Sequence, residues 1–383
     1  RVSKADPRCF EFDNGSFFFP IGHNIRSPYD SRLNKQFPWT QRWPEGSAAY
    51  TRYFRDMSKH GENIAEIWSA SWSLGLEWTK RWRGYHGIGQ YNMFNAWEID
   101  RVIDEAAAKG IYVNLVLMNH GKFSKFSDEE WEHNPFNVNN GGYLDDPEEF
   151  FSDQRALKAF RNLLRYIIAR WGYSTQVFAW ELWSELDLTG SSGKNYRRQD
   201  VVDWHRLMGR TIQEMDHNKH MVSTHVSGNY HNQNVDIISL DEMSLCPVDA
   251  YHHSEDPVQI VQLLKETAEF NAKYGKPVVV TEFGGTPYAQ SLRHLDASLH
   301  AALWASACIP LGSAPMFWWW QLIEEENFYP KFEAFSRYMA GEDRRDPELQ
   351  ISVPEIRTRD TMEDGIDIQC LKNKTRAFGW IYV

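Results

Sequence analysis

The sequence predicts an α/β fold in which parallel strands and helices alternate and close into a (β/α)8 TIM barrel, followed by a small C-terminal β appendage. Strand-like apolar runs alternate with amphipathic, helix-like segments along almost the whole chain. Eight such strands can be counted, and their apolar runs fit strands that are buried on both faces. The 383 residues exceed the roughly 250 that a barrel needs, which leaves room for long loops.

The expected strands share a short apolar run bounded by turn residues. They cover residues 17–24, 63–68, 111–118, 177–183, 220–226, 242–251, 277–282 and 315–321. The expected helices carry apolar residues at helical spacing, and the first three end at or near a glycine. They cover residues 48–60, 95–109, 153–170, 200–215, 257–273 and 292–307. The strand at 242–251 is the least regular, because Pro247 lies inside it.

The two ends of the chain differ in pattern from the middle. Residues 1–341 are expected to form the barrel, led by a hairpin whose tight turn is Asp13-Asn-Gly15. Residues 342–383 contain alternating segments typical of antiparallel strands, at 355–359, 365–370 and 377–382. The chain starts at an arginine and stops inside a strand-like run. We therefore expect that a leader was removed or that the sequence belongs to a longer protein, and that the appendage could be truncated.

Charge and composition exclude several classes of partner. A net charge of −11 argues against nucleic acid, which favours a basic surface. No apolar run approaches the roughly 20 residues needed to span a bilayer. The cysteines at positions 9, 246, 308 and 370 are scattered, without metal-ligand spacing or a dense disulfide framework.

Two glutamates, Glu185 and Glu282, each follow a strand-like run at the point where the strand meets its loop. In a barrel, that edge carries the chemistry. Two facing carboxyl groups are what cleavage of a glycosidic bond requires, one as proton donor and the other as nucleophile or base. The alternative for each is a surface carboxylate at a strand end.

The surroundings of each glutamate favour the catalytic interpretation. Trp180 and Trp183 precede Glu185, and desolvation by aromatic rings would raise its pKa, as suits a general acid. Glu181 competes for this role but lies four residues earlier, deeper in the barrel. Glu282 precedes a Gly-Gly turn and is expected to be held ionised by hydrogen-bond donors, as suits a nucleophile.

Two long connections, residues 69–94 and 119–150, follow the second and third strands and should wall a cleft beside the glutamates. The chain has 17 tryptophans, and several fall in polar loops where their rings could stack on sugars. These are Trp39, Trp43, Trp72, Trp78, Trp82 and Trp131. The alternative for any one of them is a place in the core.

The chain resembles the retaining glycoside hydrolases of clan A, and most closely cellulase-like members whose last strand carries a run of tryptophans. The resemblance covers roughly residues 10–341 and rests on residues 71–78, 167–173, 178–185, 277–282 and 316–321. It implies a carbohydrate substrate and no metal or organic cofactor. We also expect a secreted or periplasmic protein, although no signal peptide is visible in this sequence. The resemblance also implies Glu185 as acid/base and Glu282 as nucleophile, with carboxyl groups ~5–5.5 Å apart.

The resemblance extends to residues around the substrate. His120 ends the third strand where the clan places a sugar-contacting histidine, although it could instead only brace the loop. Tyr251 ends the sixth strand, where a tyrosine often hydrogen-bonds the nucleophile. A tryptophan of the last strand would lie beneath the sugar ring, either from the face of Trp318 and Trp320 or from the opposite face of Trp319. The full set of expected substrate contacts is Asn24, Arg26, Trp72, His120, Ser184, Asp249, Tyr251, Trp318 and Trp320.

Three positions depart from the clan pattern. Ser184 stands where the clan usually has an asparagine, directly before the acid/base. Glu66 stands where it usually has an arginine near the nucleophile. Asp249 stands where it often has a histidine in the sixth strand. Loss of the arginine removes a positive charge that would lower the pKa of the nucleophile, and Arg26 could substitute for it. These changes leave the substrate class open.

Two other functions compete with hydrolysis. The first is a carbohydrate-binding barrel that has lost turnover through the three departures. The second is a lyase or aldolase, which would need a Schiff-base lysine or a metal cluster at a strand end, and neither is evident. Asp249, His252 and His253 make a poor metal set, because adjacent histidines point to opposite strand faces. Nothing in these motifs selects the sugar, the linkage or the oligomeric state.

Overall fold

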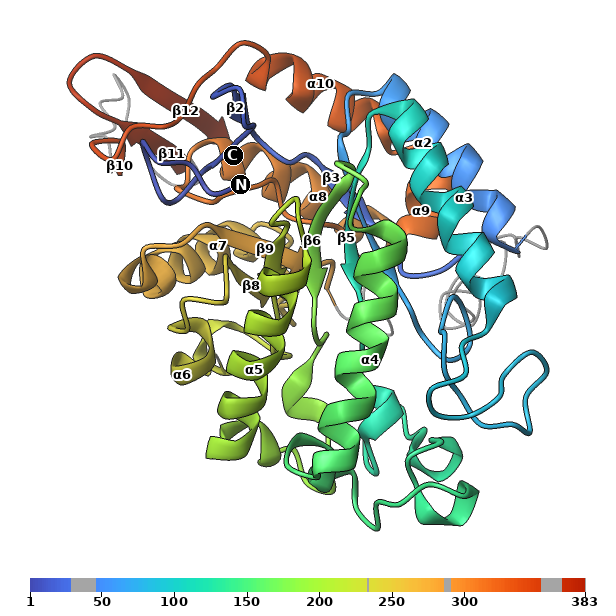
Figure 1. Ribbon diagram of the computed structural model, residues 1–383. Helices are drawn as coiled ribbons and strands as arrows, with labels where there is room; N and C mark the ends of the chain where they lie inside the picture. Colours follow the sequence, from blue (N-terminus) through green and yellow to red (C-terminus); the bar gives the residue numbers. More distant parts are fainter. Residues whose placement is uncertain (29–45, 233, 286–290, 353–366, 383) are drawn as a thin grey trace, which may run out of the picture.

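The computed structural model describes residues 1–28, 46–232, 234–285, 291–352 and 367–382 (Figure 1). Its central strands are short, parallel and buried, as the apolar runs predict. Five of them pair in chain order: β3 (Gly22–Asn24), β4 (Ile64–Trp68), β5 (Tyr112–Val116), β6 (Val177–Glu181) and β7 (Met221–Ser223). A further parallel pair is β8 (Cys246–Asp249) with β9 (Val278–Glu282).

Residues around Phe317 supply the eighth strand position. Phe317 forms parallel bridges with Phe283, just after β9, and with His23 in β3. On the opposite side, the backbone N–H of Ser244, just before β8, donates to the carbonyl oxygen of Val222 in β7 at 2.8 Å. The eight segments thus follow one another around the predicted (β/α)8 barrel.

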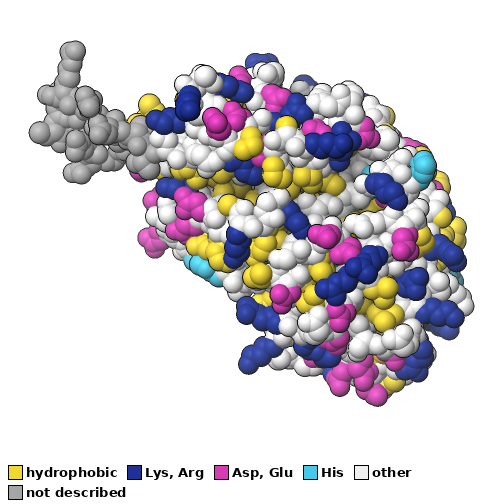
Figure 2. Space-filling view, turned by 60° about the vertical axis from the view of Figure 1, so that its left-hand side comes forward, with side chains coloured by type: hydrophobic (Ala, Val, Ile, Leu, Met, Phe, Trp, Pro, Cys, Tyr) yellow, Lys and Arg dark blue, Asp and Glu magenta, His cyan; other side chains and the backbone are white. Residues whose placement is uncertain are grey.

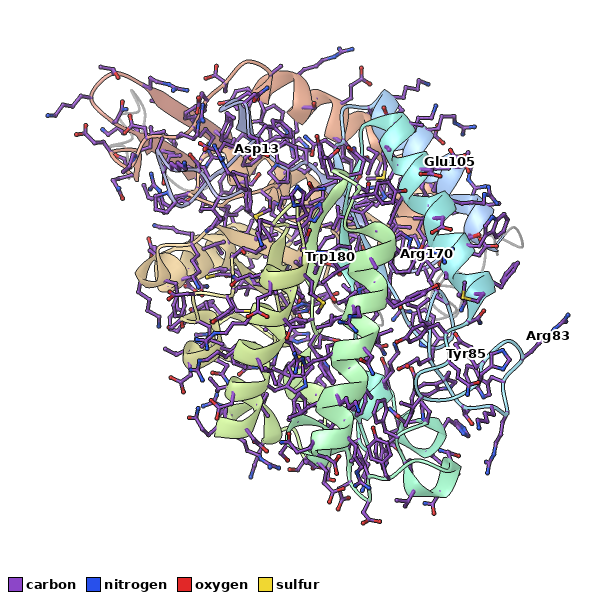
Figure 3. All side chains as sticks on the ribbon, viewed as in Figure 1. Asp13, Arg83, Tyr85, Glu105, Arg170 and Trp180 are labelled. Atoms are coloured by element: carbon purple, nitrogen blue, oxygen red, sulfur yellow. The ribbon has the colours of Figure 1, made fainter. Side chains whose placement is uncertain are left out.

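Helices cover the outside of the strands (Figure 1). They are α2 (Ala49–Lys59), α3 (Met93–Lys109), α4 (Gln154–Trp171), α5 (Gln199–Met215), α6 (Val235–Ile238), α7 (Gln259–Asn271), α8 (Leu292–Ala307), α9 (Trp320–Glu325) and α10 (Tyr329–Met339). Asn92 and Asp153 cap the first turns of α3 and α4 with their side-chain oxygens. Arg170 of α4, labelled in Figure 3, binds Asp100 of α3 at 2.6 Å and ties the two helices together.

Tryptophans fill much of the interior. Trp180 of β6, labelled in Figure 3, donates to the Oδ2 of Asp216, just after α5, at 2.9 Å. Among the loop tryptophans, Trp72 and Trp82 are 37% exposed, whereas Trp78 and Trp131 are buried. Trp39 and Trp43 lie outside the described residues. Of the loop tryptophans that the structure describes, Trp78 and Trp131 therefore belong to the core rather than to an exposed sugar-binding surface.

The expected strand at 315–321 is wrong at its C-terminal end. The backbone of Trp319 leaves the β region (φ −89°, ψ 62°), and α9 begins at Trp320. The N–H of Trp320 donates to the carbonyl oxygen of Trp318 at 3.0 Å, which closes a turn in place of a strand. The alternation of side chains expected for 318–320 is therefore lost.

The N-terminal hairpin is confirmed. β1 (Phe10–Glu11) and β2 (Phe17–Phe18) pair antiparallel, and Gly15 adopts the positive φ of 82° that the turn needs. Near it, a three-stranded antiparallel sheet joins β10 (Gln350–Ile351), β11 (Asp367–Lys372) and β12 (Ala377–Tyr382). The expected strand at 355–359 lies outside the described residues. The division of the chain into barrel and appendage at residue 341 stays a prediction.

The hairpin and the C-terminal sheet meet at one end of the molecule, where both termini lie (Figure 1). Arg345, in the segment between α10 and β10, contacts Glu11 of the hairpin at 3.1 Å. On the face in Figure 2, acidic and basic side chains are interspersed over most of the surface. Within the described parts of the chain, no helix is both long and apolar enough to cross a membrane.

Candidate active site

A cleft of about 290 Å³ lies at the ends of the barrel strands and is lined by both Glu185 and Glu282. The sequence places one glutamate after β6 and the other at the end of β9, and the barrel brings these two ends to the same face. The other lining residues are Arg26, Trp68, His120, Asp128, Tyr251, His253, Gly285, Trp318 and Trp319.

Glu185 adopts a backbone conformation that is unusual for a residue with a side chain (φ 53°, ψ 51°). Backbone hydrogen bonds hold the chain on either side of it. The N–H of Ser184 donates to Met118 at 2.8 Å, and the N–H of Leu186 donates to His225 at 3.0 Å. Strain of this kind persists where neighbouring structure enforces it, and it is enriched at functional sites.

His120 contacts the Glu185 side chain directly. Its Nδ1 lies 3.0 Å from Oε2 of Glu185, and its Nε2 lies 3.4 Å from Oδ2 of Asp128. Burial lowers the pKa of His120, but the two carboxylates outweigh burial and raise this pKa to about 9. Burial raises the pKa of Glu185, but the charge and hydrogen bond of His120 outweigh burial and bring it below the usual value.

Glu282 has the opposite electrostatic character. Burial raises its pKa well above the usual value, and the negative charges of Asp249 and Glu185 raise it further. The hydroxyl of Tyr251 donates to Oε2 of Glu282 at 3.0 Å, as the resemblance implied. Burial also raises the pKa of Tyr251 well above its usual value, so the phenol stays a donor.

These shifts are the reverse of those expected from sequence. A raised pKa was expected for Glu185 because of its aromatic flanks, and an ionised state was expected for Glu282. The expectation fails because His120, not a tryptophan, is the side chain at the Glu185 carboxylate. In the unliganded site, the surroundings thus favour the ionised form of Glu185 and the protonated form of Glu282.

A buried polar network lies beneath the two glutamates. Asn24 donates to Glu66 at 2.9 Å, and Asn114 donates to both Glu66 and Glu181, at 3.0 and 2.7 Å. His225 lies 2.7 Å from the other oxygen of Glu181 through its Nδ1. The burial of Glu66, together with the negative charge of Glu181, raises the pKa of Glu66 to about 8.

Sequence reasoning missed Asn114 and His225 and assigned Glu181 no partner. The available signal was that polar side chains at 66, 114 and 181 interrupt otherwise apolar strands. Such residues are buried only with hydrogen-bond partners, so three of them in neighbouring strands indicate a shared network.

His225 also faces two further carboxylates. Its Nε2 lies 3.4 Å from Oδ1 of Asp249 and 3.8 Å from Oε1 of Glu282. Their potential ligand atoms all lie within 4.8 Å of one another, so this trio could also hold a cation. Among the described residues, this trio has the spacing of a possible metal site, whereas Asp249, His252 and His253 together do not.

The predicted substrate contacts divide into residues that line the cleft and residues that do not. Arg26, His120, Tyr251 and Trp318 line the cleft. Four others are buried and do not line it: Asn24, Ser184, Asp249 and Trp320. Trp72 is partly exposed at the side.

Arg26 lies among tryptophan rings. Its guanidinium carbon is 4.6 Å from the ring centre of Trp72, 5.3 Å from that of Trp68 and 5.1 Å from that of Trp318. Cation–π attraction of this kind stabilises a charge that has little contact with water. The cleft therefore combines an aromatic wall with the guanidinium of Arg26 and the acidic side chains of Asp128, Glu185 and Glu282.

The fold is shared with solved barrel glycoside hydrolases. An endo-β-1,4-mannanase from Thermotoga petrophila is 13% identical and superimposes with a TM-score of 0.57 over 96% of this chain and 98% of its own. An endo-1,4-β-mannanase from Rhizomucor miehei is 16% identical, with a TM-score of 0.60 over 88% and 99%. An exo-β-1,4-mannosidase from an Opitutaceae bacterium is 17% identical, with a TM-score of 0.59 over 88% and 62%.

At these identities the likeness establishes the fold. The sequence matches no family model and no curated protein. The chain thus has the barrel fold of clan A glycoside hydrolases, as its motifs suggested.

Proposed function

We propose that this protein is a retaining glycoside hydrolase that cleaves O-glycosidic bonds by double displacement. The observation that carries the proposal is that Glu185 and Glu282 line one cleft, with Tyr251 bonded to Glu282. The barrel fold that this chain shares with glycoside hydrolases supports this chemistry by analogy. The reaction needs no metal or organic cofactor.

In the first step, Oε of Glu282 attacks the anomeric carbon while Glu185 protonates the departing oxygen. In the second step, Glu185 removes a proton from water, and the water oxygen displaces Glu282 from the sugar. The first step needs Glu282 ionised and Glu185 protonated when attack begins, and the second needs Glu185 ionised so that it can take the proton from water. The pKa shifts in the unliganded site oppose the distribution that the first step needs, because burial raises the pKa of Glu282 and the charge of His120 outweighs burial at Glu185.

The substrate that we propose first is a β-1,4-linked mannan or a β-mannoside. The neighbours of known structure are described as mannanases and mannosidases, and the cleft has tryptophans for stacking on a sugar ring. These neighbours include both endo- and exo-acting enzymes. Activity should therefore be tested on a panel of glycans that contains both polymers and aryl glycosides. Polysaccharide degradation would place the protein outside the cytoplasm.

A second candidate is a carbohydrate-binding barrel that has lost turnover. It is favoured by the raised pKa of Glu282 and by the burial of Ser184 outside the cleft lining, at the position where the clan uses an asparagine that touches the sugar. Calorimetry that detects sugar binding, together with no product from any glycan of the panel, would favour this candidate.

The test compares Glu185→Gln and Glu282→Gln on whichever glycoside the wild type cleaves. Loss of the acid/base should lower kcat/KM by about 10²- to 10⁴-fold, and loss of the nucleophile by about 10⁴-fold or more. Glu214→Gln, at an exposed position of α5, is the matched control and should leave activity unchanged. Full activity in both active-site variants would contradict the proposal.

A further inference from the structure

The departures from the clan pattern leave Glu282 without the expected arginine, because Glu66 occupies that position. A carboxylate in a buried site still needs a positive charge to ionise. We propose that His225, from the end of the fifth strand, is a positioning residue that supplies this charge to Glu282. This inference rests on the proposed function, in which Glu282 is the nucleophile.

The orientation of His225 is fixed from below. Its Nδ1 lies 2.7 Å from Oε1 of Glu181, and Asn114 donates to the second oxygen of Glu181 at 2.7 Å. With Nδ1 held in this way, Nε2 points to the strand ends opposite, 3.4 Å from Asp249 and 3.8 Å from Glu282. The imidazole thus joins three carboxyl groups that come from β6, β8 and β9.

The charges around the ring favour the imidazolium form. His225, Glu181 and Asp249 are fully buried, and Glu282 is nearly so. Buried carboxylates without a cation are very costly, so one positive charge among three acidic groups is strongly stabilised. Burial lowers the pKa of His225, but the charges of Glu181 and Asp249 outweigh burial and raise it well above its usual value.

The effect of His225 on Glu282 opposes that of the acidic groups around it. Burial, Asp249 and Glu185 raise the pKa of Glu282, whereas the charge of His225 lowers it. Asp249 competes for the same cation at a shorter distance. When Glu282 becomes a neutral ester in the glycosyl-enzyme, the imidazolium keeps Asp249 as its counter-ion.

This arrangement also explains why position 249 can be acidic. The clan usually has a histidine there, and this chain has a carboxylate whose nearest charged partner is His225. Burial raises the pKa of Asp249 to about 7, although His225 acts against this rise. The histidine on the fifth strand and the aspartate on the sixth therefore act as a pair.

The experiment measures the ionisation of Glu282 directly, so that it does not depend on turnover. The full-length protein, with ¹³C in its glutamate side-chain carboxyls, is titrated by NMR, and Glu282→Gln identifies the resonance of Glu282. In His225→Gln, the pKa of Glu282 should rise by about 1–3 units, the range that an opposite charge at this distance controls. In Asp249→Asn it should fall.

His205→Gln is the matched control. His205 is a fully buried histidine of α5 whose ring contacts Val201 and Thr224 rather than the site carboxylates. This change should leave the titration of Glu282 as in the wild type. Circular dichroism shows whether each variant is folded, and His225→Asn takes the place of His225→Gln in the titration if His225→Gln does not fold.

On a substrate that the wild type cleaves, His225→Gln should also move the acidic limb of kcat/KM to higher pH, which a merely structural role would not do. An unchanged pKa of Glu282 in folded His225→Gln would overturn the inference. A Glu282 titration that changes on chelation by EDTA would overturn it too, since a bound cation would then supply the charge. If the wild type has no glycosidase activity but the pKa of Glu282 changes as expected in the variants, the proposed function is wrong and the inference about His225 still holds.

Discussion

The Nδ1 of His120 lies 3.0 Å from Oε2 of Glu185, close enough for the imidazole and the carboxyl group to share one proton. This contact joins the loop after β5 to the strained residue after β6. It places a cation beside the side chain that we propose as proton donor. The pair therefore titrates as a unit, and its protons are lost in two macroscopic steps.

The first prediction concerns this pair. The pKa of His120 is raised to about 9, so the shared proton is lost only as the pH rises through about 9. We expect the basic limb of kcat/KM near that pH in the wild type and at lower pH in His120→Asn, where Glu185 holds the proton alone. The pH profile of kcat/KM is measured on aryl glycosides with a poor leaving group, whose cleavage depends on the proton donor. A basic limb at the same pH in His120→Asn and wild type would contradict the role of His120.

The second prediction concerns Tyr251. Its hydroxyl bonds Glu282 at 3.0 Å, and a hydrogen bond to a charged group contributes about 1.5–3 kcal/mol. Tyr251→Phe should therefore lower kcat/KM by about 10- to 100-fold. Tyr173→Phe, at an exposed residue, is the control. Steady-state kinetics that differ less than twofold between Tyr251→Phe and wild type would refute this role.

The third prediction concerns acid stability. Burial lowers the pKa of His205 to about 4, below its ordinary 6.5. The stability that this group contributes is complete above about pH 6.5 and is lost as the pH falls towards 4, because only the unfolded chain then binds the proton. The loss amounts to about 3 kcal/mol.

Urea unfolding at several pH values checks the role of His205. In His205→Gln, the free energy of unfolding should depend less on pH over this range than in the wild type. The exposed His217, changed to Gln, should leave the dependence as it is. Equal pH dependence in all three proteins would contradict the burial argument.

The fourth prediction concerns Arg344, which ties the chain after α10 to the end of α8. Its guanidinium donates to the carbonyl oxygens of Ser306 and Ile309, at 2.9 and 2.5 Å, and the side chain is buried. Arg344→Met should reduce the free energy of unfolding by about 2–4 kcal/mol, because two charge-assisted bonds are lost.

Arg337→Met is the control for this change. Arg337 is 78% exposed and pairs with Glu333 on the surface of α10, so the cost should stay within about 0.5 kcal/mol. Equal losses in the two variants, measured by denaturant unfolding, would show that the buried contacts of Arg344 contribute little.

The strands and the two glutamates could be predicted because they depend on local pattern. The apolar run before Glu282 is long enough to define β9, and parallel strands in a barrel must end on one face. The end of the last strand could not be predicted. Its three consecutive tryptophans fit a strand, but the turn at Trp319 depends on packing, since its Nε1 donates to the carbonyl oxygen of Gly284 at 3.0 Å.

The protonation of the site could not be predicted from sequence either. It depends on which side chains meet across strands, and His120 and Glu185 are 65 residues apart in the chain. His225 follows a strand of only three residues, and its role emerges only where β6, β8 and β9 converge on it. Local pattern thus located the two carboxylates, while tertiary contacts set their charges.

The most direct test of the central claim is to trap the glycosyl-enzyme. A fluorinated mannosyl fluoride is incubated with the protein, which is then digested and analysed by mass spectrometry. The account predicts one added sugar on the peptide that contains Glu282, and no adduct in Glu282→Gln. An adduct on the Glu185 peptide, or hydrolysis of a mannoside with inverted configuration at the anomeric carbon, would contradict it.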